Sequence, residues 1–189
     1  MRSFAILFAL TIAAAVTASA QVSEMAMGDG NPMVGGAAMY KTKNIVENAV
    51  NSKDHTTLVA AVKAAGLVET LAGPGPFTVF APVNSAFDKL PAGTVETLLK
   101  PENKATLTKV LTYHVLAGSF DAAAVVAAIK AGNGKAEFTT VAGGKLKAML
   151  KNGKVVLKDE KGNYSTVTTA DVRQSNGVIH VIDTVVLPN

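Results

Sequence analysis

The side chains best suited to acid–base chemistry are three well-separated histidines, His55, His114 and His180. Together with Ser85 and Asp183, His114 supplies the residue types of a hydrolase triad. However, the chain has no G-x-S-x-G motif to present a serine nucleophile, and the histidines lack the i, i+4 spacing of a helical zinc site. The carboxylates are dispersed singly. We therefore expect no catalytic residue, no metal site and no cofactor, and keep a hydrolase only as an alternative.

The C-terminal stretch S-N-G-V-I-H-V-I-D-T-V-V-L-P is a further place where chemistry could lie. Apolar residues occupy both alternating sets of positions along it, which predicts a strand that is covered on both faces. Because successive side chains on a strand point to opposite faces, His180 and Asp183 cannot form a couple. We interpret His180 as a structural residue with hydrogen-bond partners in the core. His114 continues an apolar helical stripe and is interpreted in the same way.

Lysine provides the clearest surface signal. Six lysines fall within seventeen residues on neighbouring predicted strands, and three of them, Lys145, Lys147 and Lys151, share a face. Such a surface could bind an acidic polysaccharide, or it could be a solvated sheet face that discourages edge aggregation. The candidate polyanion patch consists of Lys145, Lys147, Lys151, Lys154 and Lys158.

Composition and charge restrict the class of protein. Residues 1–20 have a basic start, an apolar run and an Ala-Ser-Ala end, the pattern of a cleavable signal peptide, and the run is too short for a membrane span. Without Arg2, 17 basic side chains face 14 acidic ones, a net charge of +3. This mild charge and the lack of Trp argue against nucleic-acid binding. The chain has no cysteine, so its domain must be stable without disulfides.

The remaining chain divides into two parts. Residues 21–40, rich in Gly, Ala and Met, predict a flexible arm. Its four methionines, as soft ligands, leave copper binding as an alternative to a purely apolar tether. Residues 41–189 predict one domain, with helical periodicity up to Gly132 and period-two strands, including an Asn152-Gly153 hairpin, after it. Helices followed by an antiparallel meander indicate an α+β fold.

Three motifs in this order resemble the fasciclin-type (FAS1) domain family. F-T-V-F-A-P-V-N-S-A-F (77–87) and N-G-V-I-H-V-I-D-T-V-V-L-P (176–188) are similar to its two signatures, and Tyr113-His114 to its Tyr-His motif. The likeness is to single-domain exported bacterial members. It implies a β-wedge of two antiparallel sheets with short helices packed in the N-terminal half. It also implies a candidate interaction motif of Tyr113, His114 and Asp183.

Together these features predict an exported, non-catalytic domain for cell adhesion or matrix interaction, located in the periplasm or outside the cell. The expected partner is a cell-surface or matrix protein or a polysaccharide, with no transmembrane anchor, and the oligomeric state stays open. A periplasmic carrier of a small apolar ligand is the alternative. We also hypothesise that Asn84 caps the helix it begins and helps to tether His114.

Overall fold

The computed structural model describes residues 31–189. The predicted signal peptide and residues 21–30 of the predicted arm lie outside this range. In the described part of the chain, none of the helices has the length and apolar character needed to cross a bilayer.

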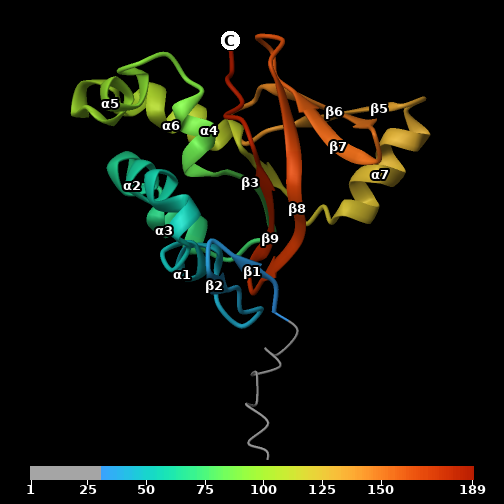
Figure 1. Ribbon diagram of the computed structural model, residues 1–189, viewed down its shortest axis with the longest axis horizontal. Coiled ribbons are helices and arrows are strands. Elements are labelled where there is room, and N and C mark those ends of the chain that lie inside the picture. The colour runs from blue at the N-terminus through green and yellow to red at the C-terminus, as the bar shows by residue number, and fades with distance from the viewer. Residues whose placement is uncertain (1–30) are drawn as a thin grey trace, which may run out of the picture.

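The helices are short, and most of them precede the meander in the sequence (Figure 1). Helix α2 ends at Gly66, whose φ of +73° is the left-handed conformation of a helix C-cap. Helix α7 begins at Asp121, whose side chain accepts a hydrogen bond from the Ala124 amide at 2.9 Å. The α-helices are α1 (Ile45–Ala49), α2 (Thr56–Ala65), α3 (Val68–Ala72), α4 (Asn84–Asp88), α5 (Thr94–Leu99), α6 (Lys104–Tyr113) and α7 (Ala122–Ala131), with 3-10 turns η1 (Lys53–His55) and η2 (Pro101–Asn103).

Seven strands form one mixed sheet in the order β4-β3-β9-β8-β7-β6-β5. The α+β class is thus confirmed. The sheet differs from the expected two antiparallel sheets in two respects. The seven strands are continuous in one sheet, and β3 and β9, which contain the two signature motifs, lie side by side and parallel. The strands are β3 (Phe77–Pro82), β4 (Val115–Ala117), β5 (Lys135–Thr139), β6 (Lys145–Lys151), β7 (Lys154–Lys158), β8 (Tyr164–Gln174) and β9 (Gly177–Ile182).

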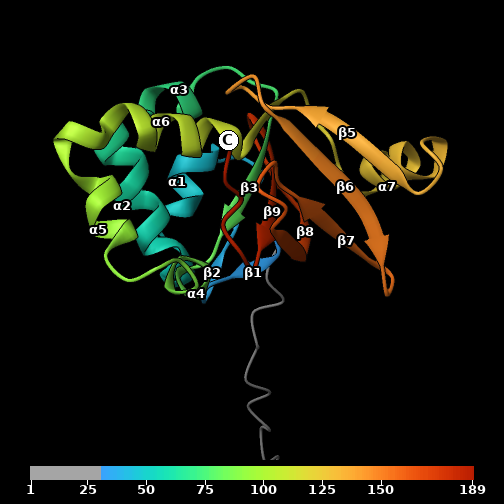
Figure 2. The same ribbon diagram turned by 90° about the horizontal axis from the view of Figure 1, so that it is seen from above.

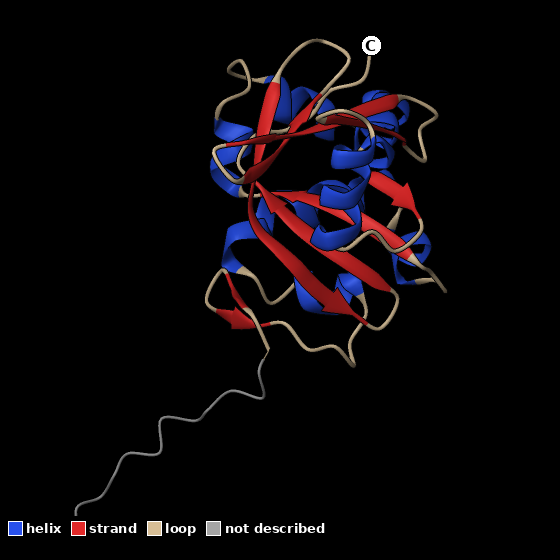
Figure 3. Cartoon of the chain, turned by 90° about the vertical axis from the view of Figure 1, so that its right-hand side faces the viewer, coloured by secondary structure: helices blue, strands red, loops and turns tan. Residues whose placement is uncertain are grey.

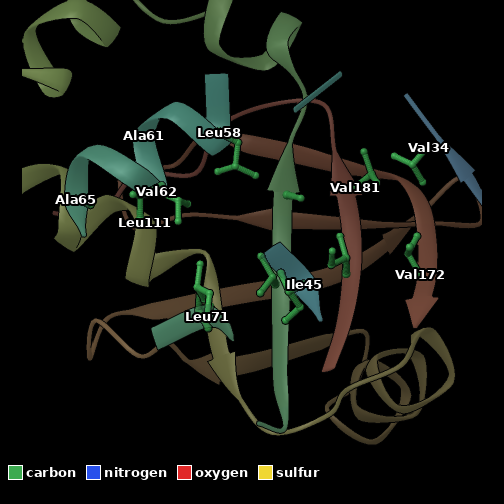
Figure 4. Close-up of a cluster of buried hydrophobic side chains, with 14 of the residues drawn as sticks. Val34, Ile45, Leu58, Ala61, Val62, Ala65, Leu71, Leu111, Val172 and Val181 are labelled. Atoms are coloured by element: carbon green, nitrogen blue, oxygen red, sulfur yellow. The ribbon is translucent and has the colours of Figure 1, made fainter. Parts of the chain in front are cut away.

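Helices cover both sides of the strands (Figures 2 and 3). On one side, α1, α2, α3 and α6 pack on β3 and β9, and we call this the helical core (Figure 4). On the other side, α7 packs on the meander, and we call this the meander core. The helical core is made mainly of aliphatic side chains, including Ile45, Leu58 and Leu111. The meander core contains aromatic rings, including Phe80 and Tyr113.

Within the predicted arm, residues 31–40 adopt a defined structure. Strands β1 (Met33–Val34) and β2 (Ala37–Ala38) form a hairpin around Gly35 and Gly36, both with positive φ. Met39 is only 2% exposed and Val34 8%, and both belong to the helical core. Of the methionines that suggested a loose tether, Met39 thus anchors this segment to the domain together with Val34, whereas Met33 is 64% exposed.

Candidate functional site

A basic surface is built by the meander strands. Asn152 and Gly153, with φ of 52° and 76°, form the two-residue turn that joins β6 to β7 and sets their register. Leu146 and Ala148 of β6 are fully buried in the meander core. The alternating side chains of β6, including Lys147, therefore lie on the face opposite α7.

The register places all five candidate lysines on this one face. Lys147 pairs directly with Lys158, and Lys151 with Lys154. Lys135 of β5 joins them, because it pairs with Met149, between Lys147 and Lys151 on β6. We define the lysine face by its six basic residues: Lys135, Lys145, Lys147, Lys151, Lys154 and Lys158.

Few groups neutralise this charge. Glu137 of β5 lies 3.5 Å from the Lys145 ammonium and 4.0 Å from that of Lys147. These side chains are about half exposed, so each ion pair contributes little to stability. Within residues 31–189, no other carboxylate forms an ion pair with a lysine of this face. The lysine face is therefore a surface of net positive charge.

An aromatic ring borders the lysine face. Tyr164 of β8 pairs with Lys158 of β7, whose ammonium lies 5.3 Å from the ring centroid. The side chain of Tyr164 is substantially exposed. A partner on the lysine face would thus meet a flat apolar surface as well as positive charge.

Tyr113 of the Tyr-His motif is fully buried. Its hydroxyl donates to the Lys145 carbonyl at 2.7 Å and accepts from the Glu160 amide at 3.2 Å. Burial raises its pKa to about 12, a shift that the Glu160 amide partly opposes. The side chain of Tyr113 therefore positions the start of β6 and the end of the β6–β7 hairpin, and it is not exposed to a partner.

His114 is buried as well, and it connects α6 to the C-terminal segment. Nδ1 lies 2.8 Å from the Val110 carbonyl, and Nε2 accepts from the Val186 amide at 3.2 Å. These partners require a neutral imidazole with its proton on Nδ1. Burial lowers the pKa of His114 to about 4, against the opposing effects of the Val110 carbonyl and Asp159.

Asp183, the third member of the interaction motif implied by the resemblance, also makes internal contacts. Its Oδ1 accepts from the Thr166 amide at 2.9 Å and from the Thr184 hydroxyl at 3.0 Å. All three residues of the candidate interaction motif implied by the resemblance, Tyr113, His114 and Asp183, thus make internal hydrogen bonds. Two of these side chains are core residues, and the third holds β8 against the segment that follows β9.

The triad alternative finds no geometric support. His114 forms its two hydrogen bonds with backbone atoms, and Asp183 bonds to Thr166 and Thr184. Ser85 is exposed on α4. Over residues 31–189, no group of three or more histidine or acidic side chains could hold a metal ion.

The side chain of His180 projects from β9 toward the meander core. Its Nε2 is 2.8 Å from the Phe120 carbonyl, and its ring stacks on Phe80 with centroids 5.6 Å apart. Burial lowers its pKa, while the Phe120 carbonyl opposes that shift. These contacts fit the structural role that we predicted for His180.

Asn84 acts on a different helix from the one we expected. Helix α4 begins at Asn84 itself and has no side-chain cap. The Asn84 Oδ1 instead accepts from the Thr57 amide at 3.1 Å in the first turn of α2, and its amide donates to the Lys53 carbonyl at 2.8 Å. Asn84 thus caps α2 across the fold, and it makes no hydrogen bond with His114.

Sequence reasoning missed two polar residues that join separate segments of the fold. Asp159 is 5% exposed and accepts from the amides of Asn163 and Leu187, at 2.7 and 2.9 Å. Asn176 accepts from the Ile45 amide at 3.0 Å and donates to two carbonyls near α3. The local D-x-x-x-N spacing was a signal for the first, whereas the partners of Asn176 are distant in sequence.

Comparisons with known proteins agree with this geometry. The family model of the fasciclin domain matches residues 53–188. The chain is 50% identical over 167 residues to Protein sll1483 of Synechocystis sp., covering 88% of this chain and 86% of that protein. It is 31% identical over 195 residues to the cell surface glycolipoprotein MPB83 of Mycobacterium bovis, covering 92% and 81%.

A solved structure shares the fold. It is a FAS1 domain pair from the insect cell adhesion molecule Fasciclin I, with a TM-score of 0.67 and 18% identity. The alignment covers 77% of this chain and 51% of that one.

Proposed function

Because this chain belongs to the fasciclin domain family, we propose that it is an exported, non-catalytic adhesion module. In this proposal the lysine face binds an anionic polysaccharide of a cell surface or matrix. The names of two similar proteins, a cell surface glycolipoprotein and a cell adhesion molecule, support a role at the cell surface.

The direct pairing of lysines across strands is the observation that carries the proposal. Like charges directly opposite each other on a sheet lower stability, each pair by a few tenths of a kcal/mol or more. The meander contains two such pairs, Lys147 with Lys158 and Lys151 with Lys154. A surface that only kept the protein soluble would mix both signs of charge, so an arrangement with this cost favours a binding role.

The neighbouring aromatic ring favours a polysaccharide among anionic polymers. Tyr164 offers an exposed, rigid apolar face, and a sugar ring has an apolar face of its own that can pack on it. The lysines provide long-range attraction for sulfate or carboxylate groups, and this attraction is screened by salt.

Titration with dextran sulfate, followed by calorimetry, tests the proposal. We expect the affinity to fall steeply between 50 mM and 500 mM NaCl, with no binding to neutral dextran. Replacement of Lys145, Lys147, Lys151, Lys154 and Lys158 by glutamine should lower the affinity at least tenfold, because these residues supply most of the charge of the face.

A matched variant controls for net charge. Glutamine at five exposed lysines outside the lysine face removes the same charge: Lys41, Lys43, Lys53, Lys100 and Lys104. This variant should bind dextran sulfate within about threefold of the wild type. Lysines outside the lysine face attract the polymer only from a distance, and salt screens that attraction. Equal losses in the two variants would show that the lysine face has no specific role.

A further inference from the structure

A cavity lies inside the helical core, on the opposite side of the fold from the lysine face. It has a volume of ≈ 50 Å³ and is enclosed by α1, α2, α3 and the strands β3 and β9. Its lining is almost entirely aliphatic, with Leu58, Val79 and Ile179 among the deeper residues. Figure 4 shows side chains of these helices converging on the strands.

The cavity reaches the surface between short helices. Val46 and Ala49 of α1 and Val59 of α2 line it and are only half-buried, so they form its mouth. Among the described residues that line the cavity, Lys63 is the one lysine, and none is acidic. Lys63 is exposed and lies one helical turn beyond Val59. Among the described residues, no carboxylate forms an ion pair with Lys63. A positive charge is therefore free at the entrance of an apolar cavity.

The interior itself carries no charge. His114 lines the cavity and is neutral, as its two hydrogen bonds require. His55 also lines it, with Nδ1 2.8 Å from the Ser52 hydroxyl. Burial lowers the pKa of His55, and the Ala81 carbonyl opposes that shift without completing a hydrogen bond to Nε2. An ionic group would lose its hydration inside such a cavity without a counter-charge, so it must stay at the mouth.

The volume limits what can enter. By the same measure a single water occupies about 10–15 Å³, so the cavity holds about four groups of the size of water or methylene. We propose that it binds a short-chain carboxylate, with the alkyl chain among the aliphatic side chains and the carboxylate at Lys63. The apolar lining supplies the affinity and Lys63 selects the sign of the head group.

Titration with hexanoate, followed through the imidazole NMR resonances of His55 and His114, tests this inference. We expect both resonances to shift saturably, because both rings line the cavity. Acetate has the same head group without the chain and should cause no saturable shift. Pentylammonium has the same five-carbon alkyl chain with the opposite charge and should bind at least fivefold more weakly than hexanoate.

Variants separate the mouth from the rest of the surface. Lys63→Gln should lower the affinity for hexanoate by up to about fivefold, the loss of one exposed ion pair, and abolish the preference over pentylammonium. Ala49→Phe should block binding, whereas the neighbouring Val50→Phe should not, since Val50 is 49% exposed and does not line the cavity. If Ala49→Phe does not fold, Val59→Phe provides the same block from α2.

Two results would overturn the inference. One is the absence of saturable shifts with hexanoate, and the other is equal binding of hexanoate and pentylammonium by the wild type. The five-glutamine variant of the lysine face should bind hexanoate as the wild type does. Failure of the carboxylate site and failure of polysaccharide binding are therefore independent results.

Discussion

The two cores of this domain differ in how their interiors are filled. In the meander core, aromatic rings such as Phe80, Tyr113 and Phe138 pack with leucines, and Leu146 and Leu157 are fully buried. The helical core depends on valine, alanine and leucine, most of its helical side chains coming from the ten-residue helices α2 and α6, and it contains the ≈ 50 Å³ cavity. Small aliphatic side chains on short helices fill less of the space above a sheet than aromatic rings do.

This difference indicates how each region can bind a partner. The meander core contains a cavity of only ≈ 10 Å³ beside Phe80 and His180, so its strands offer mainly their outer surface, and recognition there depends on charge and a flat ring. The helical core has internal space, so recognition there depends on shape and apolar contact. The Tyr-His motif joins the two regions. Tyr113 bonds to the start of the β6–β7 hairpin, and the adjacent His114 lines the cavity.

Matched truncations of two leucines test the packing difference, and they have the largest expected effects. Leu157→Ala should lower the free energy of unfolding by about 4 kcal/mol, within the range for a fully buried leucine. Leu111→Ala should cost only about 2–3 kcal/mol, because Leu111 lines the cavity and lacks packing partners on that side. Urea denaturation measures both values. Equal costs would contradict the claim that the helical core is the looser one.

The pH dependence of His114 comes next in size. Its pKa in the folded state is about 4, below the ordinary value of 6.5. Between these values the unfolded state binds more protons, so stability is complete above about pH 6.5 and decreases as the pH falls. The loss due to His114 should reach about 3 kcal/mol below pH 4.

NMR titration of each imidazole separates this effect from the protonation of carboxylates. His55 and His180, whose pKa values burial also lowers, contribute in the same direction. We expect the His114 ring to stay neutral to about pH 4. A midpoint near 6.5 would mean that His114 is not the neutral bridge between α6 and Val186 described above.

The sequence predicted most of what depends on local patterns. The Asn152-Gly153 turn and the alternating lysines were sufficient to predict the β6–β7 hairpin and the face that its lysines share, because turn type and side-chain alternation are local properties. The burial of His180 also followed from alternation along β9. Family resemblance was needed for the overall fold, because the parallel pairing of β3 with β9 joins segments about a hundred residues apart.

Contacts between distant segments limited the prediction of the site. The hydrogen-bond partners of Tyr113 and His114, such as Lys145 and Val186, come from later in the chain, so their internal roles could not be derived from the motif alone. Asn84 was assigned to its own helix because capping is usually local, whereas its partner is the Thr57 amide. The cavity results from the sizes of side chains on several elements, which no single segment reveals.

The lysine face allows a last and smallest test of the contrast between the two regions. Lys151→Glu converts the Lys151–Lys154 pair into an opposite-charge pair, which should stabilise the domain by about 0.5 kcal/mol at low salt. It should also weaken dextran sulfate binding more than Lys151→Gln does, since it changes the charge of the face by two. Urea denaturation at 20 mM and 1 M NaCl measures the stability, and the gain should disappear at high salt. If Lys151→Glu leaves low-salt stability unchanged, the lysine pairs carry no cost, and the reason for assigning this face to binding rather than solubility is lost.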